Sequence, residues 1–306
     1  MVRMKFRHAR HTLRVLSLLF MTAAVLNLSS CATWRWLWSK NHLSELPDTG
    51  KLVLDDLLAD TEEPPFEGGV PYDGTAHTGT DIYYIGKADS ENRKHVIVID
   101  AGHQLKGDSD KEPNGPGSTV MKAKVTYGAT GQFTGQLERD LNLAVALLLR
   151  DELIHRGYSV VMIRETNEVS ISNMERAELA NKYNASAYIR IHANGASDPS
   201  ANGALTISQS ASNPYPDCAA HYAESRLLSE LVLREFCGST GIRQRSVTEM
   251  DNMTGTNWSR VPTTIVEMGF LSNKGDDDLM STIEFQRNAA IGMADGIELF
   301  LMRVSE

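Results

Sequence analysis

Between residues 95 and 304, the chain alternates between short apolar runs and longer amphipathic stretches. The continuous β-branched run Val96-Ile97-Val98-Ile99 predicts a strand that is covered on both faces, as in a parallel sheet. The stretch from Glu138 to His155 has leucines clustered on one side and is followed by Gly157, which predicts a helix. Further strands are expected at 159–163, 187–191, 204–207 and 263–268, and further helices at 173–182, 218–236 and 283–302. This order predicts a single α/β domain with a mainly parallel twisted sheet flanked by helices.

The amino terminus has the pattern of an export signal. A basic stretch ends at Arg14, and the apolar run Val15 to Leu28 is shorter than the roughly 20 residues that a bilayer-spanning helix needs. The run ends in Leu28-Ser29-Ser30-Cys31, which resembles the lipobox of bacterial lipoproteins, where cleavage before the Cys is coupled to diacylglycerol attachment. We therefore expect residues 1–30 to be a lipoprotein signal peptide and Cys31 to be lipidated. An uncleaved anchor with a chance Cys is the alternative, and both place the rest of the chain outside the cytoplasm, tethered to a membrane.

The segment that follows is polar and acidic. From Ser44 to Lys94 it carries Pro64-Pro65, Gly68-Gly69 and only one short apolar patch, Leu52 to Leu58. A stretch that buries so little apolar surface cannot offset the entropy lost on ordering. We expect residues 31–94 to be a lipid-anchored tether and residues 95–306 to form the α/β domain.

Charge and cysteine content narrow the function. The chain has 30 Lys and Arg against 39 Asp and Glu, and five of the basic residues lie in the first fourteen positions. Without that end the balance is 25 against 39, or −14, and such a body repels phosphate backbones, so no nucleic-acid partner is expected. Three cysteines cannot make a disulfide framework in a chain this long. Cys218 and Cys237 lie near opposite ends of one predicted helix and are expected to be buried, unbridged residues.

Candidate catalytic side chains gather at the carboxyl ends of the predicted strands, where open parallel sheets bind ligands. One strand runs into Asp100-Ala101-Gly102-His103 and another into His192-Ala193-Asn194. Glu138 opens the helix that returns from the loop after His103. Glu267 lies inside the apolar strand TTIVEMGFL, where a carboxylate is costly to bury unless it is paired, protonated or close to a metal.

Taken together, these residues indicate a metal site more strongly than any one of them alone. A His after a strand is commonly an ordinary loop residue, and Glu138 could simply favour a helix N-terminus. Asp100 is expected to be an orienting or capping acid. However, two histidines and one carboxylate with an open fourth position are the ligand set of catalytic zinc, and a nearby second carboxylate can serve as its general base.

The same residues carry a resemblance to the zinc-dependent N-acetylmuramoyl-L-alanine amidases of the bacterial cell wall, of the amidase-3 type. It spans about residues 95 to 303 through VIVIDAGHQ, ERDLNLAVALLLRDEL, VMIRETNEVSISNMERAELAN, YIRIHANG and TTIVEMGFLSN. The resemblance implies that His103, Glu138 and His192 bind one Zn²⁺ and that Glu267 is the catalytic acid and base. It also implies that the substrate is peptidoglycan, at the amide between the lactyl group of N-acetylmuramic acid and L-Ala of the stem peptide.

Some features depart from the commonest family pattern. Gln104 stands where Gly often follows the His, and residues 104–136 are expected to be a long loop containing Gly and Pro. This arrangement resembles the clostridial branch, which implies a lipoprotein on the outer face of a cytoplasmic membrane. No obvious helix-forming insertion follows His192 of the kind that plugs the active site in some Gram-negative relatives.

Several roles stay open at the level of sequence. Arg190 shares a strand face with His192, and it could orient Glu267, hold a substrate carboxylate or form a structural ion pair. Asn194 is a further candidate for substrate contact or for support of the ligands. The loop at residues 252–260, with Trp258, could line the substrate groove or be a surface turn. A zinc peptidase or deacetylase acting on another bond of the wall, or a non-catalytic wall-binding lipoprotein, are the alternative functions.

Overall fold

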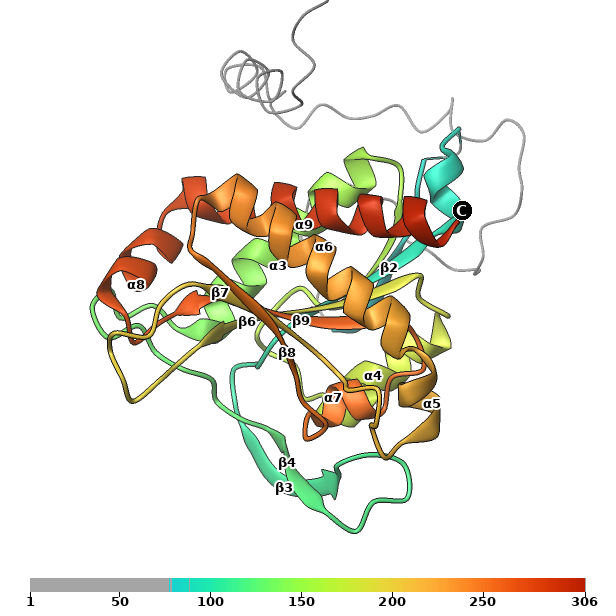
Figure 1. The fold of residues 1–306 in the computed structure, drawn as a ribbon, viewed down its shortest axis with the longest axis horizontal. Coiled ribbons are helices and arrows are strands. Elements are labelled where there is room, and N and C mark those ends of the chain that lie inside the picture. Colours follow the sequence, from blue (N-terminus) through green and yellow to red (C-terminus); the bar gives the residue numbers. More distant parts are fainter. Residues whose placement is uncertain (1–76, 78, 88, 306) are drawn as a thin grey trace, which may run out of the picture. The chain divides into compact units, whose positions relative to one another are not determined.

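The computed structural model describes residues 77, 79–87 and 89–305, which contain a seven-stranded sheet in the order β1-β5-β2-β6-β9-β7-β8 (Figure 1). Its strands are β1 (Thr80–Tyr84), β2 (Val96–Ala101), β5 (Ser159–Arg164), β6 (Ala187–Asn194), β7 (Ala204–Ser208), β8 (Gln244–Glu249) and β9 (Thr263–Phe270). The four central strands β5, β2, β6 and β9 are parallel. Strands β1 and β7 are antiparallel to their neighbours β5 and β9, and β8 is parallel to β7. The expected mainly parallel α/β sheet is confirmed.

Helices cover both faces of this sheet. They are η2 (Glu91–Lys94), α3 (Glu138–His155), α4 (Asn173–Lys182), α5 (Pro216–Ala220), α6 (Tyr222–Thr240), α7 (Thr254–Asn257), α8 (Lys274–Met280) and α9 (Ile283–Val304). Helices α3, α6 and α9 pack on one face, and α4 packs on the other (Figure 1). In β2, Ile97 and Ile99 belong to the first core, whereas Val96 and Val98 belong to the second. The continuous apolar run therefore reflects a strand buried on both sides.

Strand alternation sets the direction of the candidate catalytic side chains. In β6, Ile189 and Ile191 pack into the core under α3, α6 and α9, so His192 faces the other side of the sheet. In β9, Val266 and Met268 pack into that same core, so Glu267 also faces the other side. His192 and Glu267 are direct partners in the register of β6 and β9. Residues 75 positions apart in the chain are thus adjacent on one face.

The structure corrects the expected amino-terminal boundary of the domain. Strand β1 pairs with β5, and η2 follows it, although both lie in the segment expected to be a tether. The hydroxyl of buried Tyr84 donates to both carboxylate oxygens of buried Glu165, at 2.9 and 2.8 Å. Glu165 also accepts the backbone N–H of His77 at 2.7 Å and pairs with Arg150. The boundary predicted at residue 95 is therefore too late, because a five-residue edge strand gives little apolar signal. Residues 1–76, with Cys31, lie outside the described part.

Two further elements differ from the expectation. The predicted loop at 104–136 contains an antiparallel hairpin of β3 (Asp108–Pro113) and β4 (Met121–Val125), which extends away from the sheet on the side opposite α9 (Figure 1). The β3 sequence DSDKEP carries no apolar alternation, and the alternating β4 sequence MKAKV is only five residues long, so the sequence does not predict the hairpin. The predicted helix 218–236 is divided at His221 into α5 and α6, and Cys218 and Cys237 are free and buried, as expected. Among the described helices, none is both long and apolar enough to cross a membrane.

Candidate active site

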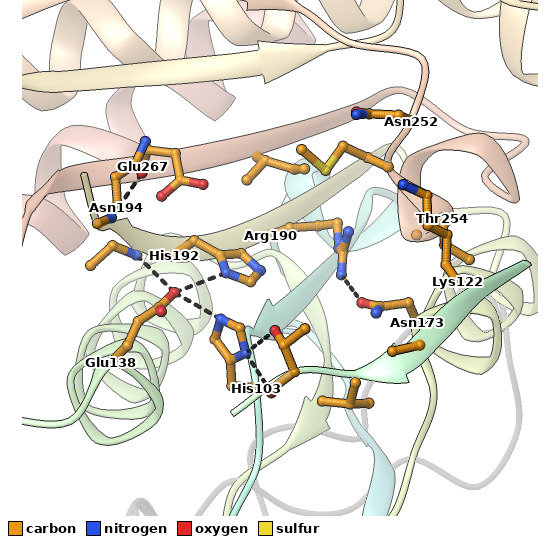
Figure 2. A pocket seen from close by; sticks show the side chains of 18 residues that line it. His103, Lys122, Glu138, Asn173, Arg190, His192, Asn194, Asn252, Thr254 and Glu267 are labelled. Carbon is orange, nitrogen blue, oxygen red and sulfur yellow. Dashed lines mark hydrogen bonds and ion pairs between the residues drawn. The ribbon is translucent and has the colours of Figure 1, made fainter. Parts of the chain in front are cut away.

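The carboxylate of Glu138, the first residue of α3, lies between two imidazoles. Its Oε1 is 2.9 Å from Nε2 of His103 and 3.1 Å from Nδ1 of His192. The two rings are 4.9 Å apart between centroids and nearly perpendicular. One ligand-type atom from each of the three residues lies within 4.8 Å of the others (Figure 2). The structure thus brings together the three side chains that the sequence predicted as metal ligands.

His103 is held by a contact on the far side of its ring. Its Nδ1 lies 2.9 Å from the carbonyl oxygen of Thr126, an acceptor that requires the proton to be on Nδ1. Nε2 of His103 is then the ring nitrogen that faces the carboxylate of Glu138. A metal ion could take that nitrogen and the carboxylate oxygen as ligands, and an imidazole oriented by a carbonyl is the usual arrangement of a metal-binding His. The donor set therefore fits a metal ion.

The backbone of the His103 turn is strained and is held by Arg176. His103 has a φ of 64°, in the left-handed region that residues other than Gly rarely adopt. The buried guanidinium of Arg176 donates to the carbonyl oxygen of His103 at 3.2 Å and pairs with Asp100 at 2.5 Å. Burial alone would raise the pKa of Asp100, but Arg176 and Arg190 hold it well below its usual value. Asp100 is thus an ionised acid that orients its neighbours.

A second buried arginine joins this turn to helix α3. Arg164 donates to the carbonyl oxygens of Gly102 and Arg139, each at 3.0 Å, and Arg139 directly follows Glu138. The turn also needs Gly at position 102, because a Cβ there would overlap the imidazole of His192. Arg164 therefore helps to fix the spacing between His103 and Glu138.

The pKa values of the two site carboxylates, Glu138 and Glu267, are shifted in opposite directions. Burial alone would raise the pKa of Glu138, but hydrogen bonds with His103 and His192 outweigh it and lower that pKa. Burial, together with the charge of Glu138, raises the pKa of Glu267 to about 8, and Arg190 only partly opposes this. Among the described residues, Oε2 of Glu267 is shielded from solvent and has no hydrogen-bond partner. Such a pair can divide the roles of ligand and proton carrier.

Arg190 forms a structural ion pair with Asp100, which is one of the three roles that the sequence left open for it. Its Nε donates to Asp100 at 2.9 Å, and its Nη2 donates to Oδ1 of Asn173 at 2.8 Å. Asn194 lines the same cavity, and its Oδ1 accepts the N–H of Gly195 at 2.8 Å. Trp258 is not among the lining residues, and its indole N–H donates to the carbonyl oxygen of Pro113 in the hairpin at 2.9 Å.

The site opens into a cavity of about 520 Å³. Strands β6 and β9 carry Arg190, His192 and Glu267 on one wall, and the hairpin strand β4 and the turn before α7 form others (Figure 2). The first four residues of the loop 252–260, Asn252 to Gly255, line the cavity, as one of the two alternatives for that loop expected. Sequence reasoning missed the lining residues Lys122 and Asn173. They lie in or beside segments interpreted as loops or as an ordinary helix start, and no spacing linked them to the metal motif.

Comparison with known proteins assigns the family. The family model described as N-acetylmuramoyl-L-alanine amidase, amidase-3, matches residues 97–299. The chain belongs to this family. The uncharacterized protein YqiI of Bacillus subtilis is 30% identical over 205 residues, which cover 67% of this chain and 84% of that protein. The amidase Rv3717 of Mycobacterium tuberculosis is 25% identical, covering 67% of this chain and 86% of the relative. The amidase LytC of B. subtilis is 28% identical, but the match covers only 34% of its length.

Solved amidase-3 structures have the same fold. Ami1 of Mycobacterium smegmatis superposes with a TM-score of 0.63 at 23% identity, covering 70% of this chain and all of that one. The catalytic domain of CwlV, from Bacillus (Paenibacillus) polymyxa, gives 0.54 at 26% identity, covering 68% of this chain and 98% of that domain. The chain is therefore an N-acetylmuramoyl-L-alanine amidase, a hydrolase of peptidoglycan. Its substrate lies outside the cytoplasm.

Proposed function

We propose that this amidase is zinc-dependent, with His103, Glu138 and His192 as the ligands of one Zn²⁺ and Glu267 as the catalytic acid and base. The observation that carries the proposal is the position of Glu138 Oε1, within hydrogen-bond distance of a nitrogen on both imidazoles. Burial lowers the pKa of His192, which favours the neutral imidazole that a metal needs. Three protein ligands leave a fourth position open, as catalytic zinc sites do.

Glu267 has the proton-transfer role in this scheme. Zinc bound at the three ligands would act as a Lewis acid on the amide carbonyl and lower the pKa of a water molecule. Glu267 accepts a proton from the attacking water and returns it to the L-Ala nitrogen as the carbon–nitrogen bond breaks. The products are a lactyl carboxylate on N-acetylmuramic acid and a free α-amine on L-Ala. The shielded Oε2 of Glu267, without a partner among the described residues, suits this task.

The remaining polar residues support this geometry. Arg190 is held between Asp100 and Asn173, so it shapes the cavity wall and keeps a positive charge near Glu267. Asn194 stands at the rim of the same cavity and is available to contact substrate.

Product analysis of purified soluble muropeptides tests the proposal. Zinc-loaded enzyme should release peptides with a free L-Ala amine, chelation should stop the release, and added Zn²⁺ should restore it. Loss of an acetyl group would indicate a deacetylase, and a cut between stem residues would indicate a peptidase. Intact substrate with fully loaded enzyme would indicate a wall-binding protein without catalysis.

For the location, we infer that Cys31 carries a lipid and that residues 32–76 tether the enzyme to the outer face of the cytoplasmic membrane. The sequence Leu28-Ser29-Ser30-Cys31 and the extracytoplasmic substrate support this. A random coil of about 45 residues has an r.m.s. span of roughly 35 Å. A tether of this kind would let the domain reach glycan strands above the membrane surface.

A further inference from the structure

The catalytic cavity has two chemically different ends. Glu138, Glu267 and both histidines occupy one end, and Arg190 lies between them and the opposite end (Figure 2). The opposite end has no carboxylate among its lining residues, which there are Lys122, Asn173, Asn252 and Thr254. A substrate that reaches from the metal end past Arg190 therefore meets polar and cationic groups.

Lys122 is the available cation at that end. It is part-buried, and within the described residues its ammonium group makes no ion pair or hydrogen bond. The neighbouring cations already have carboxylate partners: Arg190 shares Asp100 with Arg176, and Lys124 lies 3.8 Å from both Asp108 and Asp110. An ammonium group has three donors and no acceptor, so an anion in the cavity would satisfy it best.

The hairpin that carries Lys122 is braced against the domain on both strands. The carbonyl oxygen of Pro113 at the end of β3 accepts the indole N–H of Trp258 at 2.9 Å. In β4, the carbonyl oxygen of Lys124 accepts from the Asn173 side chain at 2.7 Å. Glu112, the register partner of Lys122, is buried and accepts the backbone N–H of Met174 in α4 at 3.2 Å. The position of Lys122 on the cavity wall is therefore set by packing and hydrogen bonds.

We propose that Lys122 is a specificity-determining residue that binds a carboxylate of the stem peptide beyond L-Ala, so that the enzyme prefers stems with a free carboxylate over amidated ones. This inference rests on the proposed function, because it assumes that the scissile amide lies at the metal end. The stem peptide offers carboxylates from two sources, the acidic D-Glu that follows L-Ala and the peptide's own carboxyl terminus. Both would present the same anion to Lys122.

The test uses zinc-loaded enzyme and three soluble muramyl peptides: one with free carboxylates, one amidated at D-Glu and one amidated at the carboxyl terminus. Wild type should cleave the free form with a kcat/KM about tenfold above that of the amide that removes the recognised carboxylate, mainly through KM. Whichever amide is the poorer substrate identifies the source. Lys122→Met should lower kcat/KM for the free form about tenfold and bring the ratio toward one, and Lys122→Arg should retain most of the preference.

Lys124→Met is the matched control. It lies on the same strand, two residues away, it is engaged by Asp108 and Asp110, and it does not line the cavity. It should keep the wild-type ratio. Thermal melting and zinc content, measured for each variant, separate a folding defect from a change in recognition, and Lys122→Gln replaces Lys122→Met if the latter melts early.

The possible results distinguish a failure of this inference from a failure of the proposed amidase function. Wild type could release the free L-Ala amine but show no preference between free and amidated stems, or Lys122→Met could keep the preference of wild type. Either result would show that Lys122 does not bind a stem carboxylate, and it would leave the proposed amidase mechanism intact. If fully loaded wild type cuts a different bond, the proposed function fails first and the inference fails with it.

Discussion

The guanidinium of Arg176 donates a 3.2 Å hydrogen bond to the carbonyl oxygen of His103, so a buried cation fixes the backbone of a proposed metal ligand. A left-handed φ at a residue other than Gly persists only where the surroundings impose it. Arg176 supplies that constraint without touching the substrate cavity.

Replacing Arg176 with Lys should therefore weaken zinc binding. Lys122 and other lining residues are untouched, but a single ammonium group cannot reproduce the forked contacts to Asp100 and His103. We expect about a 10- to 100-fold loss of zinc affinity in competition with a chelator, with turnover partly restored by excess Zn²⁺. Arg226→Lys, in an exposed ion pair with Glu230 on α6, is the control. If a folded Arg176→Lys protein binds zinc as tightly as wild type, the backbone turn at His103 does not depend on Arg176.

Substitutions of Glu138 and Glu267 should have different effects on zinc binding and on turnover. Glu138→Gln removes an anionic oxygen from between the imidazoles, so it should lower zinc affinity and activity, with partial rescue by added metal. Glu267→Gln keeps the shape but cannot carry a proton, so it should bind near-stoichiometric zinc and lose about 100- to 10,000-fold in kcat without rescue. Metal analysis and muropeptide release on both proteins decide this. A zinc-free or fully active Glu267→Gln would show that the base is assigned to the wrong residue.

Protonation of Asp277 in α8 should destabilise the turn at residues 131–136, which precedes helix α3. Its buried carboxylate accepts the N–H groups of Phe133 and Thr134 and the side chains of Thr134 and Gln136, at 2.6–2.9 Å. Burial alone would raise the pKa of Asp277, but these hydrogen bonds outweigh it and lower the pKa below the usual 3.8. The folded protein thus binds this proton more weakly than the unfolded chain does.

The stability that Asp277 contributes is therefore complete above about pH 4 and is lost as the pH falls through its folded pKa. Asp277→Asn should cost about 1–3 kcal/mol in free energy of unfolding at pH 7, and less below pH 3. Denaturant unfolding of both proteins across pH 2.5–7 measures the difference. Parallel pH profiles would mean that the carboxylate is not the group that holds residues 131–136.

The amino-terminal strand should be required for stability. Tyr84→Phe removes the hydroxyl that donates to buried Glu165, which should cost about 1–3 kcal/mol. Tyr222→Phe, which removes an exposed hydroxyl bonded to Glu249, should cost far less. A chain that begins at residue 95 lacks β1 and should melt well below one that begins at residue 70. Equal melting temperatures for those two chains would place the boundary where the sequence alone put it.

Cys31→Ala should release the exported protein from the membrane fraction, because a single acylated residue is the proposed anchor. Fractionation of cells, with an immunoblot for the domain, measures this. Ser30→Ala keeps a small residue before the Cys and should remain membrane-bound. If Cys31→Ala stays with the membrane after cleavage of the signal peptide, the anchor is not the lipid.

The sequence predicted the central sheet because each buried strand is a run of β-branched and apolar residues, as in β2 and β6. It predicted that His103, Glu138 and His192 lie close together, because residues that follow parallel strands meet at one edge of the sheet, and their role as metal ligands stays a prediction. It missed β1 and the hairpin because β1 and β4 are only five residues long and β3, DSDKEP, is polar throughout, so none of them carries an extended apolar pattern. It could not predict the contacts of Asn173 with Arg190 and with Lys124, since they join segments that no motif relates.

The β3–β4 hairpin lies between His103 and Glu138 in the chain: β3 begins five residues after His103, and β4 ends 13 residues before Glu138. Arg164 and Arg176 hold the backbone at both of these residues through hydrogen bonds outside the hairpin strands, so we expect the hairpin to tolerate changes in length and composition. Within one domain, substitutions in the hairpin would then change which stem peptide is bound, and the residues that carry out hydrolysis would stay the same. Exchange of residues 105–125 between family members is the manipulation that would transfer substrate preference while keeping the catalytic centre of the host.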